Sequence, residues 1–341
     1  MRTAPREYTG ILHDLAVRPD GVVWAIGEDT GTAWMGRFEA DGWRQVELPS
    51  VKGLGLATTI DARGNVWAFI GSPDHGSELD HSYAARWDGK AWQVTDLGPG
   101  LFVQDAVTVG EEIWFLAKHG PYDPESPAVV KRLTGGIWVD TKVPIPAEGL
   151  DGQAPGEVWA VGRGRERVDT GPEDRQPTAA RWNGHRWETV PLPPLEQLPQ
   201  DGRAIFWDVL VRGHGQVWAA GGIFGSSGEE QPGSRALLAR WDGRTWRIEV
   251  EADGVLEGAG FMEIEADGRG GAWLRDSHDT YLRHLDATGR TIQRQRLDGG
   301  QNCSQNITAI ARKPETTMLW GAGAYADCSG GVYRAALYQV D

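Results

Sequence analysis

The chain has 341 residues, including 47 glycines and 17 tryptophans, and a formal net charge of −14 at pH 7. This length is ample for a large core, and the acidity without any basic stripe argues against a nucleic-acid partner and favours a cationic ligand. No apolar run approaches the roughly 18 residues of a membrane span, so no membrane partner is expected.

The first ten residues, MRTAPREYTG, contain no apolar segment typical of a signal peptide. We therefore expect a cytoplasmic protein, or a secreted one if a signal has been removed, and we expect a monomer. The two cysteines, Cys303 and Cys328, are separated too widely for a CxxC motif. They are either free thiols in a reducing cell or one disulfide in an oxidising compartment.

A short apolar segment with a central tryptophan recurs through the whole chain. Its first copies are VVWAIG and NVWAFIG. The central tryptophans are Trp24, Trp67, Trp114, Trp159, Trp218, Trp273 and Trp320, at spacings of 43 to 59 residues. A period in this range is typical of β-propeller blades.

Each repeat is predicted to form four short strands. In the second repeat, the Trp67 segment is strand two, the segment ending at Trp87 is strand three, and residues 91–97 are strand four. Strands three and four meet in a heptad that is spelled RWDGKAW, RWNGHRW and RWDGRTW at residues 86–92, 181–187 and 240–246. An Asp-Gly or Asn-Gly pair between apolar runs is a strong hairpin signal, because a tight two-residue turn needs positive φ at both positions. No segment is convincingly helical.

Most of the other tryptophans also hold repeated positions. Five are predicted in fourth strands (Trp43, Trp92, Trp138, Trp187 and Trp246), three end third strands (Trp87, Trp182 and Trp241), and only Trp34 and Trp207 fall outside the pattern. A wide wedge between adjacent sheets needs large flat side chains. We therefore interpret the tryptophans, and the heptad that carries many of them, as packing between blades.

The sequence predicts an all-β protein: one seven-bladed β-propeller of four-stranded antiparallel blades over residues 1–341. The last repeat ends after its third strand, so residues 1–11 are predicted to supply the outer strand of the last blade and close the ring. The predicted blades are approximately residues 12–50, 54–98, 102–145, 148–193, 204–250, 259–298 and 305–341.

These repeats resemble short-repeat bacterial seven-bladed propellers, namely the sensor propellers of two-component regulators and the virginiamycin B lyase type. The resemblance rests on the DG-x-x-W hairpins and on WMGRFEADGWRQVELP at residues 34–49, and it covers the whole chain as architecture. It implies the propeller fold. The lyase family uses a metal with carboxylate and histidine partners, but its histidine motif matches no position here, so no catalytic residue carries over.

Carboxylates recur near the start of the predicted first strands. The residue ten positions before the strand-two tryptophan is Asp14, Asp208 or Glu263 in three of the repeats. In the third and fourth repeats we assume a hairpin shorter by one and by two residues, and the equivalent residues are then Asp105 and Asp151. The second repeat gives Ala57 and the seventh gives Thr308. In this alignment, the five carboxylates ring the mouth of the axial channel.

Close carboxylates repel, so some must be protonated or a cation must lie among them. Hard oxygen ligands favour Ca²⁺ or Mg²⁺, and we predict Asp14, Asp208 and Glu263 as the ligands of such an ion. An organic cation would also fit, and so would a purely structural role in which each carboxylate accepts backbone N–H bonds. Trp207, His13 and Gln104 precede three of these carboxylates and are added to the candidate ligand-binding site, although neighbours in a strand point to opposite sides.

Long, uneven loops between second and third strands lie on the same predicted face as the carboxylates, where binding residues usually concentrate. Two of them carry weaker signals, DHGSELDH at residues 74–81 and RGRER at 163–167, both better explained as solvated loops. We therefore predict a ligand-binding propeller with an acidic site that holds a divalent cation or a cationic small molecule. The alternatives are an enzyme, namely a lyase, hydrolase or cyclase that uses the same carboxylates, and a scaffold for protein contacts.

Overall fold

The computed structural model describes residues 2–3, 9–40, 42–71, 81–119, 127–164, 175–196, 198, 202–213, 215–224, 235–251, 260–277, 281–296, 302–327 and 333–340. Most of the long loops, and Cys328, lie outside these residues. No helix among the described residues is long and apolar enough to cross a membrane.

The described strands form antiparallel four-stranded units, which we number as blades in chain order. Blade one is β2 (Gly10–Val17), β3 (Val23–Asp29), β4 (Thr32–Glu39) and β5 (Gly42–Gln45). Blade two is β6 (Leu54–Ile60), β7 (Val66–Gly71), β8 (His81–Trp87) and β9 (Trp92–Pro99). Blade three is β10 (Leu101–Val109), β11 (Glu112–His119), β12 (Ala128–Thr134) and β13 (Ile137–Asp140). Blade four is β14 (Ala147–Ala154), β15 (Glu157–Arg163), β16 (Pro177–Trp182) and β17 (Trp187–Thr189).

Blade five is β18 (Arg203–Gly213), β19 (Gln216–Phe224), β20 (Arg235–Trp241) and β21 (Trp246–Val250), and one residue pair, Arg163 with Ile205, joins it to blade four. Blade six is β22 (Phe261–Ala266), β23 (Ala272–Asp276), β24 (Tyr281–Leu285) and β25 (Thr291–Arg296). Blade seven is β26 (Asn302–Arg312), β27 (Leu319–Asp327) and β28 (Arg334–Val340), completed by β1 (Arg2–Thr3).

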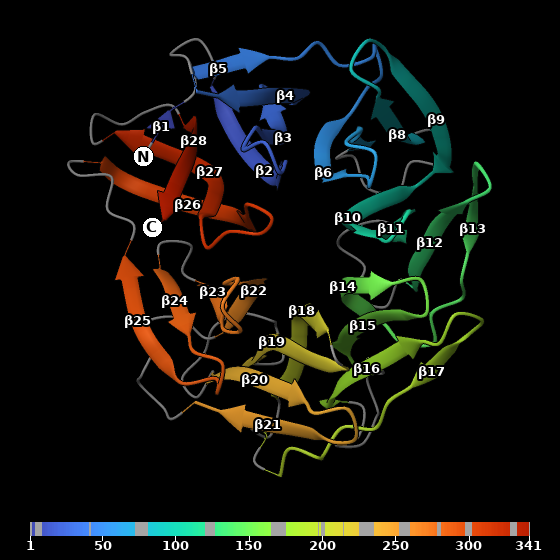
Figure 1. The fold of residues 1–341 in the computed structure, drawn as a ribbon, viewed down its shortest axis with the longest axis vertical. Coiled ribbons are helices and arrows are strands. Elements are labelled where there is room, and N and C mark those ends of the chain that lie inside the picture. Colours follow the sequence, from blue (N-terminus) through green and yellow to red (C-terminus); the bar gives the residue numbers. More distant parts are fainter. Residues whose placement is uncertain are drawn as a thin grey trace.

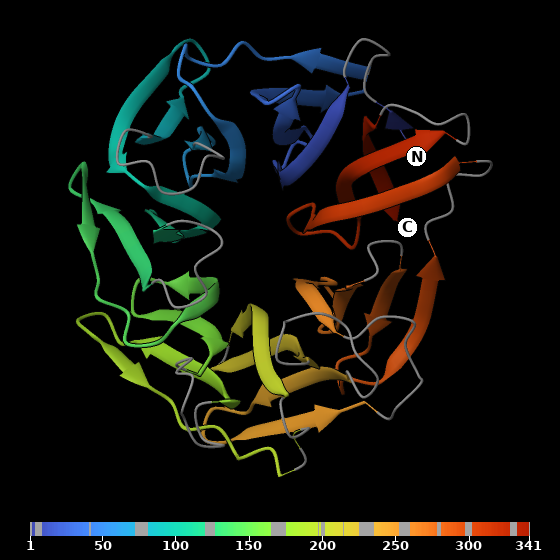
Figure 2. The same ribbon diagram turned by 180° about the vertical axis from the view of Figure 1, so that it is seen from behind.

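The blades are arranged in a ring around a central axis, so the molecule is a β-propeller (Figure 1, and from behind in Figure 2). The first strand of each blade lies nearest the axis and the fourth lies at the rim. Both termini belong to blade seven, where β1 pairs with β28. The N-terminal segment therefore supplies the outer strand of the last blade as predicted, through Arg2 and Thr3 and a single bridge from Thr9 to Arg334.

The tryptophans hold the repeated positions predicted for them and pack between neighbouring blades. Trp114 on β11 is fully buried, and its ring lies edge-on to Trp182 and Trp187 of blade four, with centroids 5.7 and 6.3 Å apart. Trp159 on β15 lies edge-on to Trp246 of blade five and is tilted by 55° to Trp241 of the same blade. Edge-to-face contacts of this kind favour one angle between adjacent sheets, in addition to the apolar area they bury.

The repeated heptad is a structural unit. In its second copy, Arg181 lies opposite Trp159 in the sheet and its guanidinium covers the Trp159 ring at 5.9 Å, while Trp182 and Trp187 face each other across the hairpin. The turn differs from the prediction, because only its glycine has positive φ. In RWDGKAW, Gly89 has a φ of 96°, and Asp88 instead accepts the backbone N–H groups of Lys90 and Ala91 at 2.8 and 2.9 Å. The aspartate therefore acts as a side-chain cap of the turn.

We expect Trp114→Ala to lower the free energy of unfolding by about 3–5 kcal/mol, because it opens a cavity between blades three and four. Trp92→Ala removes a half-buried ring at the rim and should cost clearly less. Urea unfolding followed by circular dichroism compares the two variants. An equal or larger loss for Trp92→Ala would contradict the assignment of the second-strand tryptophans to the blade interfaces.

Candidate functional site

Every first strand is interrupted by a β-bulge near its middle. The residues inside the bulges are His13, Leu56, Gln104, Glu148, Trp207, Met262 and Thr308. A bulge adds one residue and re-aims the side chains that follow it. In each blade, the residue after the bulge pairs with the second-strand residue that lies two positions after the repeated tryptophan. This pairing gives a common register for comparing the blades.

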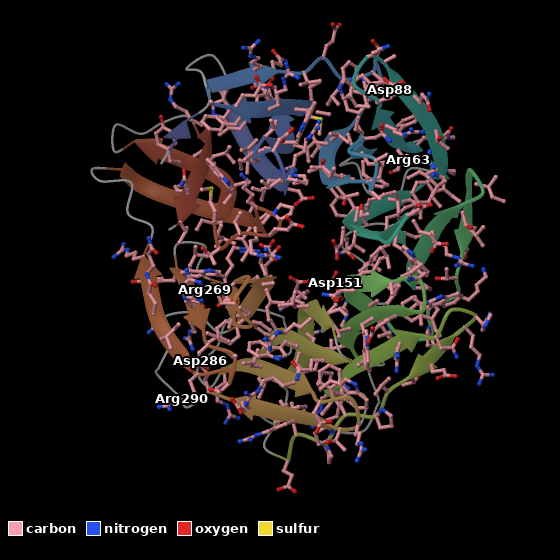
Figure 3. All side chains as sticks on the ribbon, viewed as in Figure 1. Arg63, Asp88, Asp151, Arg269, Asp286 and Arg290 are labelled. Carbon is pink, nitrogen blue, oxygen red and sulfur yellow. The ribbon has the colours of Figure 1, made fainter. Side chains whose placement is uncertain are left out.

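This register defines an upper tier of equivalent residues, namely Asp14, Ala57, Asp105, Gly149, Asp208, Glu263 and Ala309. A lower tier lies two residues further along each strand, opposite the tryptophan itself: Ala16, Thr59, Val107, Asp151, Leu210, Glu265 and Ala311. Residues two apart in a strand share a face, so the two tier residues of each blade lie on one side of its first strand, the strand nearest the axis. In Figure 3, Asp151 points from β14 toward the middle of the ring.

The register corrects two sequence alignments. Asp151 belongs to the lower tier, because its strand partner is Trp159, and Gly149 holds the position equivalent to Asp14. Gly149 lies the standard ten residues before Trp159, so the gap that we introduced to reach a carboxylate was wrong. In blade seven, Thr308 lies in the bulge and Ala309 takes the tier position. Glu265 was not predicted, although its place two residues after Glu263 was the available signal.

We call the six carboxylates of the two tiers the axial acidic cluster: Asp14, Asp105, Asp151, Asp208, Glu263 and Glu265. Most of them receive a backbone N–H bond from the first strand of the next blade. The bonds run from Thr58 to Asp14 (2.7 Å), Leu150 to Asp105 (3.0 Å), Val211 to Asp151 (2.6 Å), Ile264 to Asp208 (2.8 Å) and Ile310 to Glu263 (2.9 Å). These carboxylates therefore clamp one blade to the next.

The other two boundaries are bridged by hydroxyls. Between blades two and three, the Thr59 and Thr108 hydroxyls are 3.1 Å apart, and Thr108 donates to the Ile60 carbonyl at 2.8 Å. Between blades seven and one, Thr308 donates to the Leu12 carbonyl. Each boundary around the axis thus has at least one side-chain clamp, which agrees with the structural role considered for the carboxylates.

The clamps do not remove the electrostatic conflict at the axis. Burial raises the pKa of Asp14 and of Asp151 to about 8. Nearby carboxylates contribute to both shifts: Glu263 and Asp105 act on Asp14, and Glu265 and Asp105 act on Asp151. Burial also raises the pKa of Glu265 to about 7 and of Glu263 to about 6, although Arg312 and Arg275 oppose the shifts.

The remaining two members interact with each other. Burial raises the pKa of Asp208 well above its ordinary value, and the Asp105 and Glu263 charges add to that shift. Burial raises the pKa of Asp105 to about 6. Because carboxylates of different blades affect one another's protonation, they share a common electrostatic environment across the axis.

Of the three predicted neighbours, His13 reaches the next blade, whereas Trp207 packs within its own blade. His13 Nδ1 lies 2.8 Å from the Gly55 carbonyl of blade two, and Trp207 packs edge-on against Phe224 at 6.0 Å. The side-chain oxygen of Gln104 is buried, with no hydrogen-bond partner among the described residues. All three lie inside bulges, so none of them holds a tier position.

Glu148, the bulge residue of blade four, is the centre of a buried ion cluster that sequence reasoning missed. Its carboxylate lies 2.5 Å from Lys118 Nζ and 3.1 Å from Arg163 Nε, and all three side chains are buried. Burial lowers the pKa of Lys118 even though Glu148 opposes the shift. The cluster joins blade three to blade four at the ends of β11 and β15, and it accounts for the first arginine of the RGRER segment.

Within the described ranges, no three His, Cys, Asp or Glu side chains are grouped closely enough to hold a metal ion. Asp14, Asp208 and Glu263 come from blades one, five and six, and each uses one oxygen in a clamp to a neighbouring blade. The geometry thus does not assemble them as one ligand set, and the divalent cation stays a prediction. Of the DHGSELDH loop, only His81 is described, and it is 2.7 Å from Asp96.

The raised pKa values give stability an unusual pH dependence. Each cluster carboxyl has a pKa of about 4 in the unfolded chain and a higher pKa in the folded chain. At a pH between these two pKa values, the folded chain therefore binds more protons than the unfolded chain. Lowering the pH from about 8 toward 5 should therefore raise the free energy of unfolding, by at most about 1.4 kcal/mol per pH unit for each group.

Urea titrations at several pH values measure this slope. Asp14→Asn and Asp151→Asn should each reduce it, since an amide cannot titrate. Asp88→Asn is the matched control, because the pKa of that exposed turn aspartate is lowered by the backbone N–H groups of Ala91 and Lys90. A wild-type stability that falls steadily between pH 8 and pH 5 would contradict the assignment.

Comparison with known proteins agrees with the fold. No family model and no curated protein sequence matches the chain. Among solved structures, an inactive virginiamycin B lyase from Staphylococcus aureus with quinupristin is 14% identical at a TM-score of 0.63, with 99% of this chain and 98% of that chain covered. A polysaccharide lyase, ulvan lyase, is 14% identical at 0.57 (99% and 96% covered), and YCF48 bound to D1 peptide is 12% identical at 0.58 (99% and 94% covered). At such low identity the likeness shows the fold alone: the chain is a β-propeller similar in architecture to virginiamycin B lyase.

Proposed function

We propose that the protein is a ligand-binding propeller whose axial acidic cluster takes a cationic small molecule. The observation that supports this is the excess of negative charge at the axis. Six carboxylates from five blades face it, whereas among the described residues their ion-pair partners are Arg275, 3.1 Å from Glu263, and Arg312, 3.9 Å from Glu265. A bound cation would favour the ionised form of these carboxyls, whose pKa values are raised by burial first and by mutual repulsion second.

The clamps leave capacity for a ligand. An ionised carboxylate offers about four acceptor positions, and Asp14, Asp151 and Asp208 each use two of them for backbone N–H groups. An ammonium or guanidinium group has several N–H donors and can contact carboxylates that are too far apart to coordinate one metal ion. This favours an organic cation over Ca²⁺ or Mg²⁺.

Isothermal titration calorimetry with spermidine, and separately with Ca²⁺ and Mg²⁺, tests the proposal. Binding at pH 7 should be saturable and should release protons, because a cation lowers the pKa of carboxyls that are protonated in the free protein. Comparing buffers of different ionisation enthalpy measures the proton release. Binding of Ca²⁺ or Mg²⁺ without binding of spermidine would show that the cluster takes a divalent metal ion and not an organic cation.

The matched variant is Asp14→Asn, Asp208→Asn and Glu263→Gln together, which keeps one oxygen acceptor at each clamp and removes three negative charges. We expect at least about a tenfold loss of affinity for spermidine, from the loss of charged hydrogen bonds. Exchange of the exposed acids Asp88 and Asp242 for asparagine controls for net charge. Unchanged affinity in the triple variant, with its fold retained, would reject the site.

A second candidate is acid–base catalysis at the same cluster, favoured by the spread of its pKa values. With pKa values of about 6 for Glu263 and about 8 for Asp14, one group is mainly ionised and the other mainly protonated at pH 7. Incubation with quinupristin and with ulvan, followed by mass spectrometry for eliminated products, tests the lyase alternative. Product formation that is abolished by Glu263→Gln would support the lyase alternative. If both substrates stay intact, lyase activity on these two compounds is excluded.

A further inference from the structure

A groove of about 760 Å³ lies between blades two and three, away from the axial acidic cluster. Its walls are the turns that join first to second strands, at residues 61–63 of blade two and 110–112 of blade three, and the β12–β13 turn at residues 133–136. These turns are on the opposite face from the long loops. The volume falls within the range of about 300–1,000 Å³ that is usual for small-molecule sites.

The wall from blade two presents two guanidinium groups. Arg86 Nε is buried and has no hydrogen-bond partner among the described residues, and its nearest carboxylate oxygen, on Asp61, is 3.9 Å away. Asp61 is already occupied, because it accepts the backbone N–H groups of Arg63 and Asn65, the Asn65 amide and the Trp67 indole. The Arg63 side chain is exposed in the turn between β6 and β7, and no described carboxylate forms an ion pair with it.

At the equivalent position of blade four, Arg181 covers the Trp159 ring at 5.9 Å, and several other blades have a carboxylate partner there. Arg37 of blade one is 3.1 Å from Glu39, Arg132 of blade three is 3.4 Å from Glu112, and His284 of blade six is 2.9 Å from Asp267. Each therefore has a close carboxylate partner. Arg86 has one described ion pair, the 3.9 Å contact with Asp61, and it also attracts the exposed Asp88. Its guanidinium lines the groove and can receive an anionic group of a ligand.

The wall from blade three has the opposite charge. Glu111 is exposed beside Gly110 in the β10–β11 turn, and no described cation forms an ion pair with it. Glu112 is adjacent but engaged, with Arg132 at 3.4 Å and the Trp114 indole at 3.1 Å. The groove thus has two guanidinium groups and the hydrogen-bonded Asp61 carboxylate on blade two, and the Glu111 and Glu112 carboxylates on blade three. Ile113, Leu133 and Pro155 are its apolar lining.

This lining argues against two common ligand classes. A sugar would need an open aromatic face, but Trp67, the one aromatic among the lining residues, is only 6% exposed and packs edge-on against Trp138. A nucleotide or another polyanion would be repelled by Asp61, Glu111 and Glu112. A ligand with one charge of each sign matches both walls.

From this division of charge, we infer that the groove binds a small zwitterion of the amino-acid or dipeptide class. Its carboxylate lies on Arg86 and Arg63, its ammonium on Glu111, and an apolar side chain on Ile113 and Leu133. The site is separate from the axial acidic cluster, so it can be tested whatever the outcome there.

Isothermal titration calorimetry with the dipeptide L-leucylglycine tests the inference against two capped analogues, N-acetyl-leucylglycine and leucylglycinamide. Each cap removes one charge, and each should weaken binding roughly tenfold or more, as expected for one charged hydrogen bond. Arg86→Gln should weaken the free dipeptide to the same degree but leave the affinity of the amide unchanged. Glu111→Gln should weaken the free dipeptide but leave that of the acetylated one unchanged.

Arg181→Gln is the matched control, since Arg181 holds the same strand position in blade four and does not line the groove. If Arg86→Gln lowers the melting temperature, Arg63→Gln and the groove-filling Ala62→Trp replace it, because both positions are exposed. Absence of saturable binding up to millimolar dipeptide, or capped analogues that bind as well as the free dipeptide, would overturn the inference.

Discussion

The ring depends on hydrogen bonds that cross from one first strand to the next beside the axis. A propeller blade cannot pair its first strand edge-on with its neighbour all along its length, so backbone N–H groups near the axis need other acceptors. Here, carboxylates supply them at five boundaries, as Asp14 does for Thr58, and threonine hydroxyls bridge the other two. The bulge in every first strand makes this possible, because it sets the side chain after it toward the axis.

These clamps have an electrostatic cost that the tryptophan packing offsets. Asp14 and Asp151 are held where ionisation is unfavourable, because burial raises their pKa values to about 8. Further from the axis, rings such as Trp114 and Trp159 bury large apolar areas between blades. The wedge between two blades widens outward, and tryptophans of second, third and fourth strands fill it, as Trp114 does with Trp182 and Trp187.

The repeat pattern was enough to predict the architecture, because a tryptophan in each second strand and a turn after each third strand are encoded locally. The prediction held for the strand order, the closing N-terminal strand and the roles of the tryptophans. The tier of each carboxylate was harder to predict, because it depends on the positions of bulges and on hairpin lengths, which leave no signal in the sequence. Asp151 was aligned with Asp14 by a gap that the structure does not contain, and Glu265 was overlooked although it shares a face with Glu263.

The groove could not have been predicted from the repeats at all, because it arises from what the repeats do not share. Arg86, Arg181 and Arg240 look identical within their heptads, yet Arg240 lies against Glu249, Arg181 covers Trp159, and Arg86 is left facing a cavity with its nearest carboxylate already occupied. The difference is made by the neighbouring blade, whose turns bring Glu111 and three glycines, Gly110, Gly135 and Gly136, to the other wall. In a repeat protein, the conserved part of the unit maintains the ring, and specificity for a ligand comes from positions where one unit departs from the others.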